Sequence, residues 1–176
     1  MRAWPILLFT TMALNLISQP DLRDILYIAH NMREWDRREI FATRWDDDPN
    51  ILAMDTMRWG NMTHVAWNDH RPVAVIGAIE VWPTVWSVWM YGTDEFPSIG
   101  LGMTRFVRER FIPAIIERGA RRGECKSIDG HDQAHRWLES LGAVREGEPL
   151  LNYGKRGETF HTYVWDPNDV RRRRRR

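Results

Sequence analysis

The segment PVAVIGAIEV, residues 72–81, most constrains how this 176-residue chain can fold. It is almost wholly apolar and rich in β-branched side chains, which predicts a strand covered on both faces. The next segment, TVWSVWMYG at residues 84–92, alternates so that Val85, Ser87 and Trp89 share one side, as in a strand. Because only a short turn separates the two segments, they predict two long consecutive strands near the middle of the chain.

Helical patterns lie before and after these strands. Pro20-Asp21 is a helix-opening pair, and a stripe of apolar residues at helical spacing follows Gly100 and Gly102. Helices are predicted at residues 21–32, 33–45, 51–57, 103–119 and 131–142, and the remaining strands at 13–17, 63–67, 124–128, 143–146 and 159–165. Pro113 predicts a kink in the helix at 103–119. The sequence shows no internal repeat and no linker, so we expect one domain over residues 12–166.

The two ends of the sequence differ from the part between them. The apolar run at residues 4–17 lacks a signal-peptide cleavage site and is shorter than the roughly 20 residues of a membrane helix, so we predict no membrane span. Met12 could be the true start, which would make residues 1–11 an extension. Residues 167–176 end in six arginines, Arg171 to Arg176, and this charge run predicts a disordered tail. If the protein contacts nucleic acid, we expect the contact to be made by this tail alone. Without these arginines, 19 Lys and Arg face 24 Asp and Glu, a net charge of −5.

The sequence gives little indication of a metal site or a disulfide bond. Cys125 is the only cysteine, which excludes an internal disulfide and a cysteine-based zinc finger and favours a reducing compartment. The acidic run DDDPN at residues 46–50 favours a solvated turn, because Mg²⁺ and Ca²⁺ sites need ligands at defined spacing. His131 and His135 share one helical face but lack a visible third ligand. We therefore predict no metal site.

Two features are candidates for acid–base or anion chemistry. Glu80 ends the apolar strand, where a carboxylate could act as a general base if burial shifted its pKa; the alternative is a charged strand end that meets water. Gly100 and Gly102, in PSIGLG at residues 97–102, precede a predicted helix. Glycines there either let backbone N–H groups hold a phosphate or simply end a loop.

From residue 91 to residue 142 the sequence resembles the two best-known motifs of the GNAT superfamily of N-acetyltransferases. PSIGLG resembles the family's (Arg/Gln)-x-x-Gly-x-(Gly/Ala) loop, with Pro97 in the Arg/Gln position. HDQAHRWLESLG resembles the helix that follows, with Ala134 and Gly142 matching, His131 in place of Asn, and Leu138 where the family usually has a Tyr that protonates the leaving thiolate.

The resemblance implies a GNAT-like α/β fold, a mixed and mostly antiparallel sheet flanked by helices. It also implies an acetyl-CoA site. The N–H groups expected to bind the pyrophosphate belong to Ile99, Gly100, Leu101, Gly102 and Met103. Glu80 or a water would then be the base.

DLRDILYIAHNMREWDRREI near the start and AHRWLESLGAV later resemble a narrower branch, the GNAT-like internal virion proteins of short-tailed phages and prophages. This branch implies a virion-associated or assembly protein without catalysis, found in the virion or host cytoplasm, with other virion proteins as partners. It predicts a V-shaped opening between central strands that Trp side chains plug. The second hypothesis is an acetyl-CoA-dependent N-acetyltransferase acting on an unknown amine.

Overall fold

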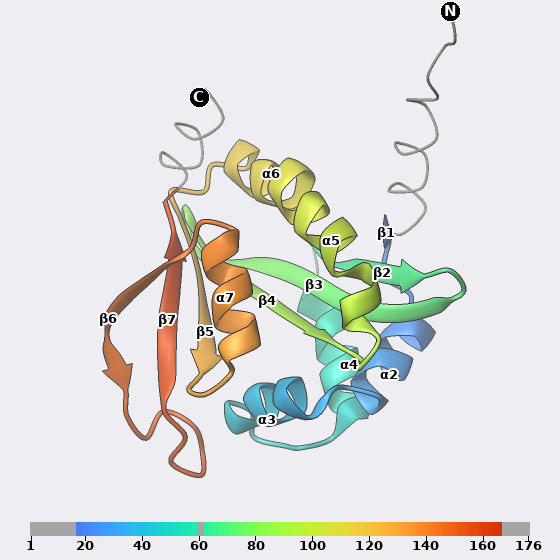
Figure 1. Ribbon diagram of the computed structural model, residues 1–176, viewed down its shortest axis with the longest axis horizontal. Helices are drawn as coiled ribbons and strands as arrows, with labels where there is room; N and C mark the ends of the chain where they lie inside the picture. The colour runs from blue at the N-terminus through green and yellow to red at the C-terminus, as the bar shows by residue number, and fades with distance from the viewer. Residues whose placement is uncertain (1–16, 60–61, 167–176) are drawn as a thin grey trace, which may run out of the picture.

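A seven-stranded sheet forms the centre of the computed structural model, which describes residues 17–59 and 62–166 (Figure 1). The strands are β1 (Ile17–Ser18), β2 (His64–Asn68), β3 (Arg71–Trp82), β4 (Val85–Gly92), β5 (Arg122–Ile128), β6 (Val144–Leu150) and β7 (Phe160–Trp165). The helices are α2 (Leu22–His30), α3 (Glu34–Ala42), α4 (Pro49–Trp59), α5 (Phe96–Phe106), α6 (Ile112–Glu117) and α7 (Asp132–Ser140). Residues 1–16 and 167–176, which include the predicted extension, most of the first predicted strand and the arginine tail, lie outside the described residues.

The strand order is β1-β2-β3-β4-β5-β7-β6, and β4 with β5 is the one parallel pair in this sheet. The mixed, mostly antiparallel sheet is therefore as predicted. β3 and β4 pair along almost their whole length, from Ala74↔Gly92 to Trp82↔Val85. Pairing of β4 with β5 runs only from Val85↔Arg122 to Ser87↔Glu124 and then ends, so the sheet is split in its middle.

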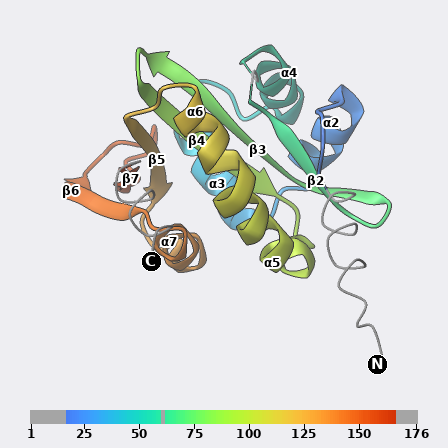
Figure 2. The same ribbon diagram turned by 90° about the horizontal axis from the view of Figure 1, so that it is seen from above.

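Helices cover both faces of the sheet, with α5, α6 and α7 on one side and α2 and α4 on the other (Figure 2). The alternation of β3 divides the core accordingly. Ile76 packs with residues of α5 and α7, whereas Val75 packs with α2 and α4. Residues 72–78 of β3 are all buried, which confirms the prediction of a strand covered on both faces for this part, whereas Glu80 and Val81 at its end are exposed.

Local signals explain two helix starts. The Asp21 side chain accepts a hydrogen bond from the N–H of Arg23, so it caps α2 as the Pro20-Asp21 pair indicates. Asp48 does the same for α4, accepting from the N–H of Asn50 at 2.8 Å. Asp47 lies 2.5 Å from Nζ of Lys155 and 2.8 Å from Arg156. The acidic run DDDPN thus caps a helix and anchors the β6–β7 loop.

The start of α5 differs from the prediction. The helix begins at Phe96, so Gly100 and Gly102 lie inside it instead of in a loop before it. Pro97 stands in the first turn, where its fixed φ and missing N–H favour a helix start. The irregularity predicted at Pro113 takes the form of a π-helical turn, Val107–Phe111, between α5 and α6.

The second half of the chain shows one further difference. β6 extends to Leu150, past a bulge after Glu146, so part of the predicted polar loop belongs to the sheet. None of the helices that the structure describes has the length and apolar character needed to cross a membrane.

Candidate functional site

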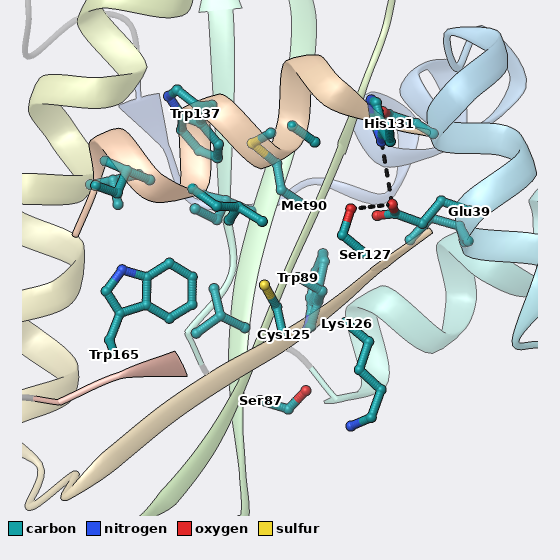
Figure 3. Close-up of a pocket in the computed structure, with 18 of the residues that line it drawn as sticks. Glu39, Ser87, Trp89, Met90, Cys125, Lys126, Ser127, His131, Trp137 and Trp165 are labelled. Atoms are coloured by element: carbon teal, nitrogen blue, oxygen red, sulfur yellow. Dashed lines mark hydrogen bonds and ion pairs between the residues drawn. The ribbon is translucent and has the colours of Figure 1, made fainter. Parts of the chain in front are cut away.

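A cavity of about 310 Å³ lies where β4 and β5 separate (Figure 3). Beyond Ser87, β4 has no β5 partner, so its backbone groups on that edge are open to a ligand that lies along the strand. The cavity reaches through the sheet from the α7 side to the α3 side. It is lined by side chains of both strands, β7, α3, α7 and the turn after α5, among them Ser87, Trp89, Met90, Cys125, Ser127, Trp137, Leu138 and Trp165.

The two ends of the cavity differ in polarity. Toward α6 and α7 the walls are apolar, with Met90, Leu138 and Trp165. Toward α3 they carry Asp36, Glu39 and a histidine, His131, that precedes α7. An apolar chamber with a few convergent polar groups at one end is the usual form of a small-molecule site.

Glu39 joins α3 to the end of β5 and to His131 (Figure 3). Its Oε2 accepts hydrogen bonds from Oγ of Ser127 at 2.7 Å and from the N–H of Ile128 at 2.8 Å. Nδ1 of His131 lies 3.3 Å from the same oxygen. Because a carboxylate only accepts hydrogen bonds, this contact assigns a proton to Nδ1 of His131.

Asp36 holds α3 to the end of β4. Its Oδ2 accepts from the N–H of Gly92 at 2.7 Å, and its Oδ1 lies 2.9 Å from Nη2 of Arg33. Only 3% of Asp36 is exposed, and this burial raises the pKa of its carboxyl above the ordinary value, against the opposing effects of Arg33 and the Gly92 N–H. Oδ1 of Asp36 is also 3.9 Å from Nε2 of His131, so the imidazole lies between two carboxylates.

The His131 ring packs against an aromatic side chain of α3. It stacks on Trp35, with centroids 5.4 Å apart and planes 11° from parallel. Gly130 before it has φ +82°, and a Cβ there would lie 3.3 Å from the Trp35 ring. His135, one turn later, has other partners: Nε2 contacts the carbonyl of Ile128, and the ring packs against His161. The two histidines of HDQAH therefore have different contacts, and of the two only His131 lines the cavity.

The predicted site residues fall in different places. Glu80 does not line the cavity; it is exposed, and its Oε1 accepts from the N–H of Thr84 in the β3–β4 turn. Its position corresponds to the charged strand end given as the alternative. Leu138 does line the cavity, as the family motif implies for that position. Ile99 to Met103 lie within α5, and their binding of a pyrophosphate stays a prediction.

The predicted V-shaped opening is present, and Trp89, Trp137 and Trp165 line it without filling it, since the cavity remains. Asp36 and Glu39 were not predicted as site residues. They belong to the charge run EWDRREI, which resembles a solvated helix face in sequence. Their three-residue spacing places both on one side of α3, but only the folded chain shows that this side faces the split.

Comparison with known proteins finds likeness in structure alone. No family model matches the sequence, and no curated protein matches it. Solved structures match over most of their length. Ribosomal-protein-alanine N-acetyltransferase from Brucella melitensis has a TM-score of 0.65 at 16% identity, covering 86% of this chain and 99% of that one. A GNAT-family acetyltransferase from Bacillus anthracis has a TM-score of 0.65 at 13% identity, covering 85% and 93%.

YncA from Salmonella typhimurium, solved with acetyl-CoA, has a TM-score of 0.64 at 14% identity, covering 85% of this chain and 92% of that one. These likenesses show that the chain has the GNAT fold. The narrower resemblance to phage virion proteins receives no support from them.

Proposed function

We propose that this chain, which has the GNAT fold, is an N-acetyltransferase that moves an acetyl group from a thioester donor, acetyl-CoA in the first instance, to an amine. The observation that carries the proposal is the cavity in the split sheet, which brings a carboxylate-bound histidine to the open edge of β4. The neighbour from Brucella melitensis, named as an N-acetyltransferase, supports the same function, and YncA, named as an acetyltransferase, was solved with acetyl-CoA.

The acyl-thioester end of acetyl-CoA fits the residues present. The unpaired edge of β4 past Ser87 offers backbone groups to an extended arm, and Met90 and Leu138 provide apolar contact. When bound, acetyl-CoA supplies an activated acyl carbonyl. The N-terminal end of α5, by contrast, does not offer the free N–H groups that its diphosphate needs, because Phe96 and Ser98 donate to Thr93 and Glu95.

His131 is the general base in this proposal. With Nδ1–H directed at Glu39, the Nε2 lone pair is free to take a proton from an incoming ammonium or amine. Glu39 is a positioning residue: it fixes the ring and its charge stabilises the imidazolium, as the third member of a catalytic triad does. Asp36, with Oδ1 3.9 Å from Nε2, places a second carboxyl group on the other side of the ring.

The amine attacks the acyl carbon directly in this proposal. Cys125 lines the cavity, but burial raises the pKa of its thiol well above the ordinary value, so the thiol stays protonated and is a poor nucleophile at neutral pH. Leu138 has no proton to donate to the leaving thiolate. Solvent provides that proton, and we expect the thiolate to leave more slowly than with an acid in place.

The non-catalytic virion protein remains the second hypothesis, based on sequence resemblance alone. The two hypotheses differ in what the cavity binds. Isothermal titration with acetyl-CoA, followed by assay of thiol release with a panel of primary amines, separates them. Saturable binding with amine-dependent release is expected for the transferase. No heat of binding at about millimolar ligand, and no release with any amine, would exclude it.

A further inference from the structure

The backbone N–H groups in the first turn of α5 are already hydrogen-bonded to nearby carbonyls. The N–H of Phe96 donates to the carbonyl of Thr93 at 3.0 Å, and that of Ser98 donates to the carbonyl of Glu95 at 2.9 Å. Pro97 between them has no N–H. Residues further along an α-helix donate to carbonyls four residues earlier, so their N–H groups do not point out of the helix start. An anion at this end would therefore find no free backbone donors.

The first turn of α5 is also fixed by packing. Phe96 and Ile99 are each 6% exposed and belong to the core between α5, α7 and the sheet. The Phe96 ring meets Trp137 of α7 edge to face at 6.0 Å, and Trp137 Nε1 donates to Oγ1 of Thr104 at 2.9 Å. Unwinding this turn to free its N–H groups would expose Phe96 and Ile99 to water.

Charge at the start of α5 also disfavours a diphosphate. Asp94 and Glu95 stand directly before the helix, and negative side chains there disfavour the approach of an anionic ligand. Glu95 accepts from Nη1 of Arg71 at 2.8 Å and lies 3.4 Å from Nδ2 of Asn68. The nearby guanidinium of Arg71 is thus already paired with a carboxylate.

The cavity for the acyl group is nonetheless intact, with its open β4 edge and with His131 beside Glu39. The acyl-thioester arm needs the cavity, whereas the nucleotide needs free N–H donors at the start of α5. The cavity is present, but those donors are not free. We propose that the acyl donor is recognised through its acyl-thioester arm alone, so that a short acyl thioester of the pantetheine type serves as well as acetyl-CoA. This inference rests on the proposed function and specifies which part of the acyl donor the protein recognises.

The transfer step is the same for either donor. The amine nitrogen forms a bond to the acyl carbon, the carbon–sulfur bond breaks, and the sulfur leaves with its electron pair. His131 takes the proton that the amine loses, and a solvent proton goes to the thiolate. No oxidant or further co-reactant is needed.

Isothermal titration with three ligands tests the inference: S-acetyl-pantetheine, acetyl-CoA and 3′-phospho-ADP. We expect the first two to bind with dissociation constants within about threefold, and 3′-phospho-ADP not to compete. Tighter binding of acetyl-CoA by tenfold or more, or competition by 3′-phospho-ADP, would overturn the inference and leave the transferase standing. If neither thioester binds, both the inference and the proposed function fail.

Gly100→Ala provides a second measurement. A Cβ at Gly100 meets no atom within 4 Å, so the helix accepts it without displacement. A glycine that lets a phosphate approach its backbone does not tolerate this change. We expect acetyl-CoA and S-acetyl-pantetheine to bind the variant within about twofold of the unchanged protein. A tenfold loss confined to acetyl-CoA would show that the nucleotide does lie on α5.

Discussion

Trp89 lies over Gly77, its direct partner across the β3–β4 pair. A Cβ built on Gly77 would be 2.1 Å from Cζ2 of the Trp89 ring, far inside van der Waals contact. Trp89 in turn lines the cavity and stacks on Tyr91 at 6.0 Å. The wall of the candidate site on this face therefore depends on the absence of a side chain at Gly77.

Gly77→Ala should displace the Trp89 ring and lower the free energy of unfolding. Forcing one extra carbon into a packed site costs about 1–3 kcal/mol. Gly123→Ala on β5 is the matched control, because its Cβ would meet Trp165 at an ordinary 3.8 Å. Urea unfolding followed by fluorescence measures both, and equal stability of the two variants would contradict the close contact.

Replacing the proposed base should abolish most acyl transfer. For His131→Gln we expect kcat to fall by about 10²–10⁴-fold, the usual contribution of a general base. His135→Gln, inside α7 but outside the cavity lining, is the control and should keep kcat within about threefold. Steady-state kinetics with a saturating amine measures this. A similar loss in both variants would point to damage of α7 instead of loss of a base.

Glu39→Gln tests the positioning role. A glutamine oxygen can still accept the hydrogen bonds from Ser127 and Ile128, but it carries no charge to stabilise a protonated His131. We expect kcat to fall by roughly tenfold or more while KM for the thioester changes little, since Glu39 acts through His131. Partial recovery with Glu39→Asp would support a charge effect. A rise in KM at constant kcat would instead assign Glu39 to ligand binding.

Gly100→Ala should stabilise the protein. In a helix interior, alanine is more stable than glycine by roughly 0.5–1 kcal/mol, and no neighbour obstructs the new methyl group. Gly119→Ala should have the opposite sign, because Gly119 after α6 has φ +92°. Thermal and urea unfolding of the pair check the difference. Destabilisation by Gly100→Ala would mean that this residue is not in a regular helix.

His64 predicts a dependence of stability on pH. Burial against Phe106 and Phe111, with a smaller effect of Arg118, lowers the pKa of His64 below its ordinary value of 6.5. The unfolded chain then binds a proton more readily, so stability is fully present above pH 6.5 and is lost as pH falls toward the folded pKa.

We expect the urea midpoint of the protein to drop between pH 7 and pH 5, and part of that drop to vanish in His64→Gln. His70→Gln, in the exposed β2–β3 turn, is the control and should behave like the unchanged protein. An identical drop in all three proteins would show that His64 does not contribute.

The sequence by itself was sufficient for most elements of the fold. The apolar run of β3, the alternation of β4 and the cap at Asp21 act over a few residues, so their consequences appear in the sequence pattern. The start of α5 was misplaced because glycine is a weak guide: it suits a phosphate-binding loop, but it also occurs inside a helix at a cost of only about 0.5–1 kcal/mol. The burial of Phe96 and Ile99, which requires the earlier start, arises only from contact with α7 and the sheet.

The site was decided by tertiary structure. His131, flagged by its spacing from His135, becomes a candidate base only because Glu39, 92 residues earlier, reaches its Nδ1. Glu80 was prominent in sequence as the end of a buried strand, yet the β3–β4 turn carries it away from the cavity. Local patterns determine which residues are helical or extended. Which charged side chains are buried, and which of them pair, depends instead on the elements that come together where β4 and β5 separate.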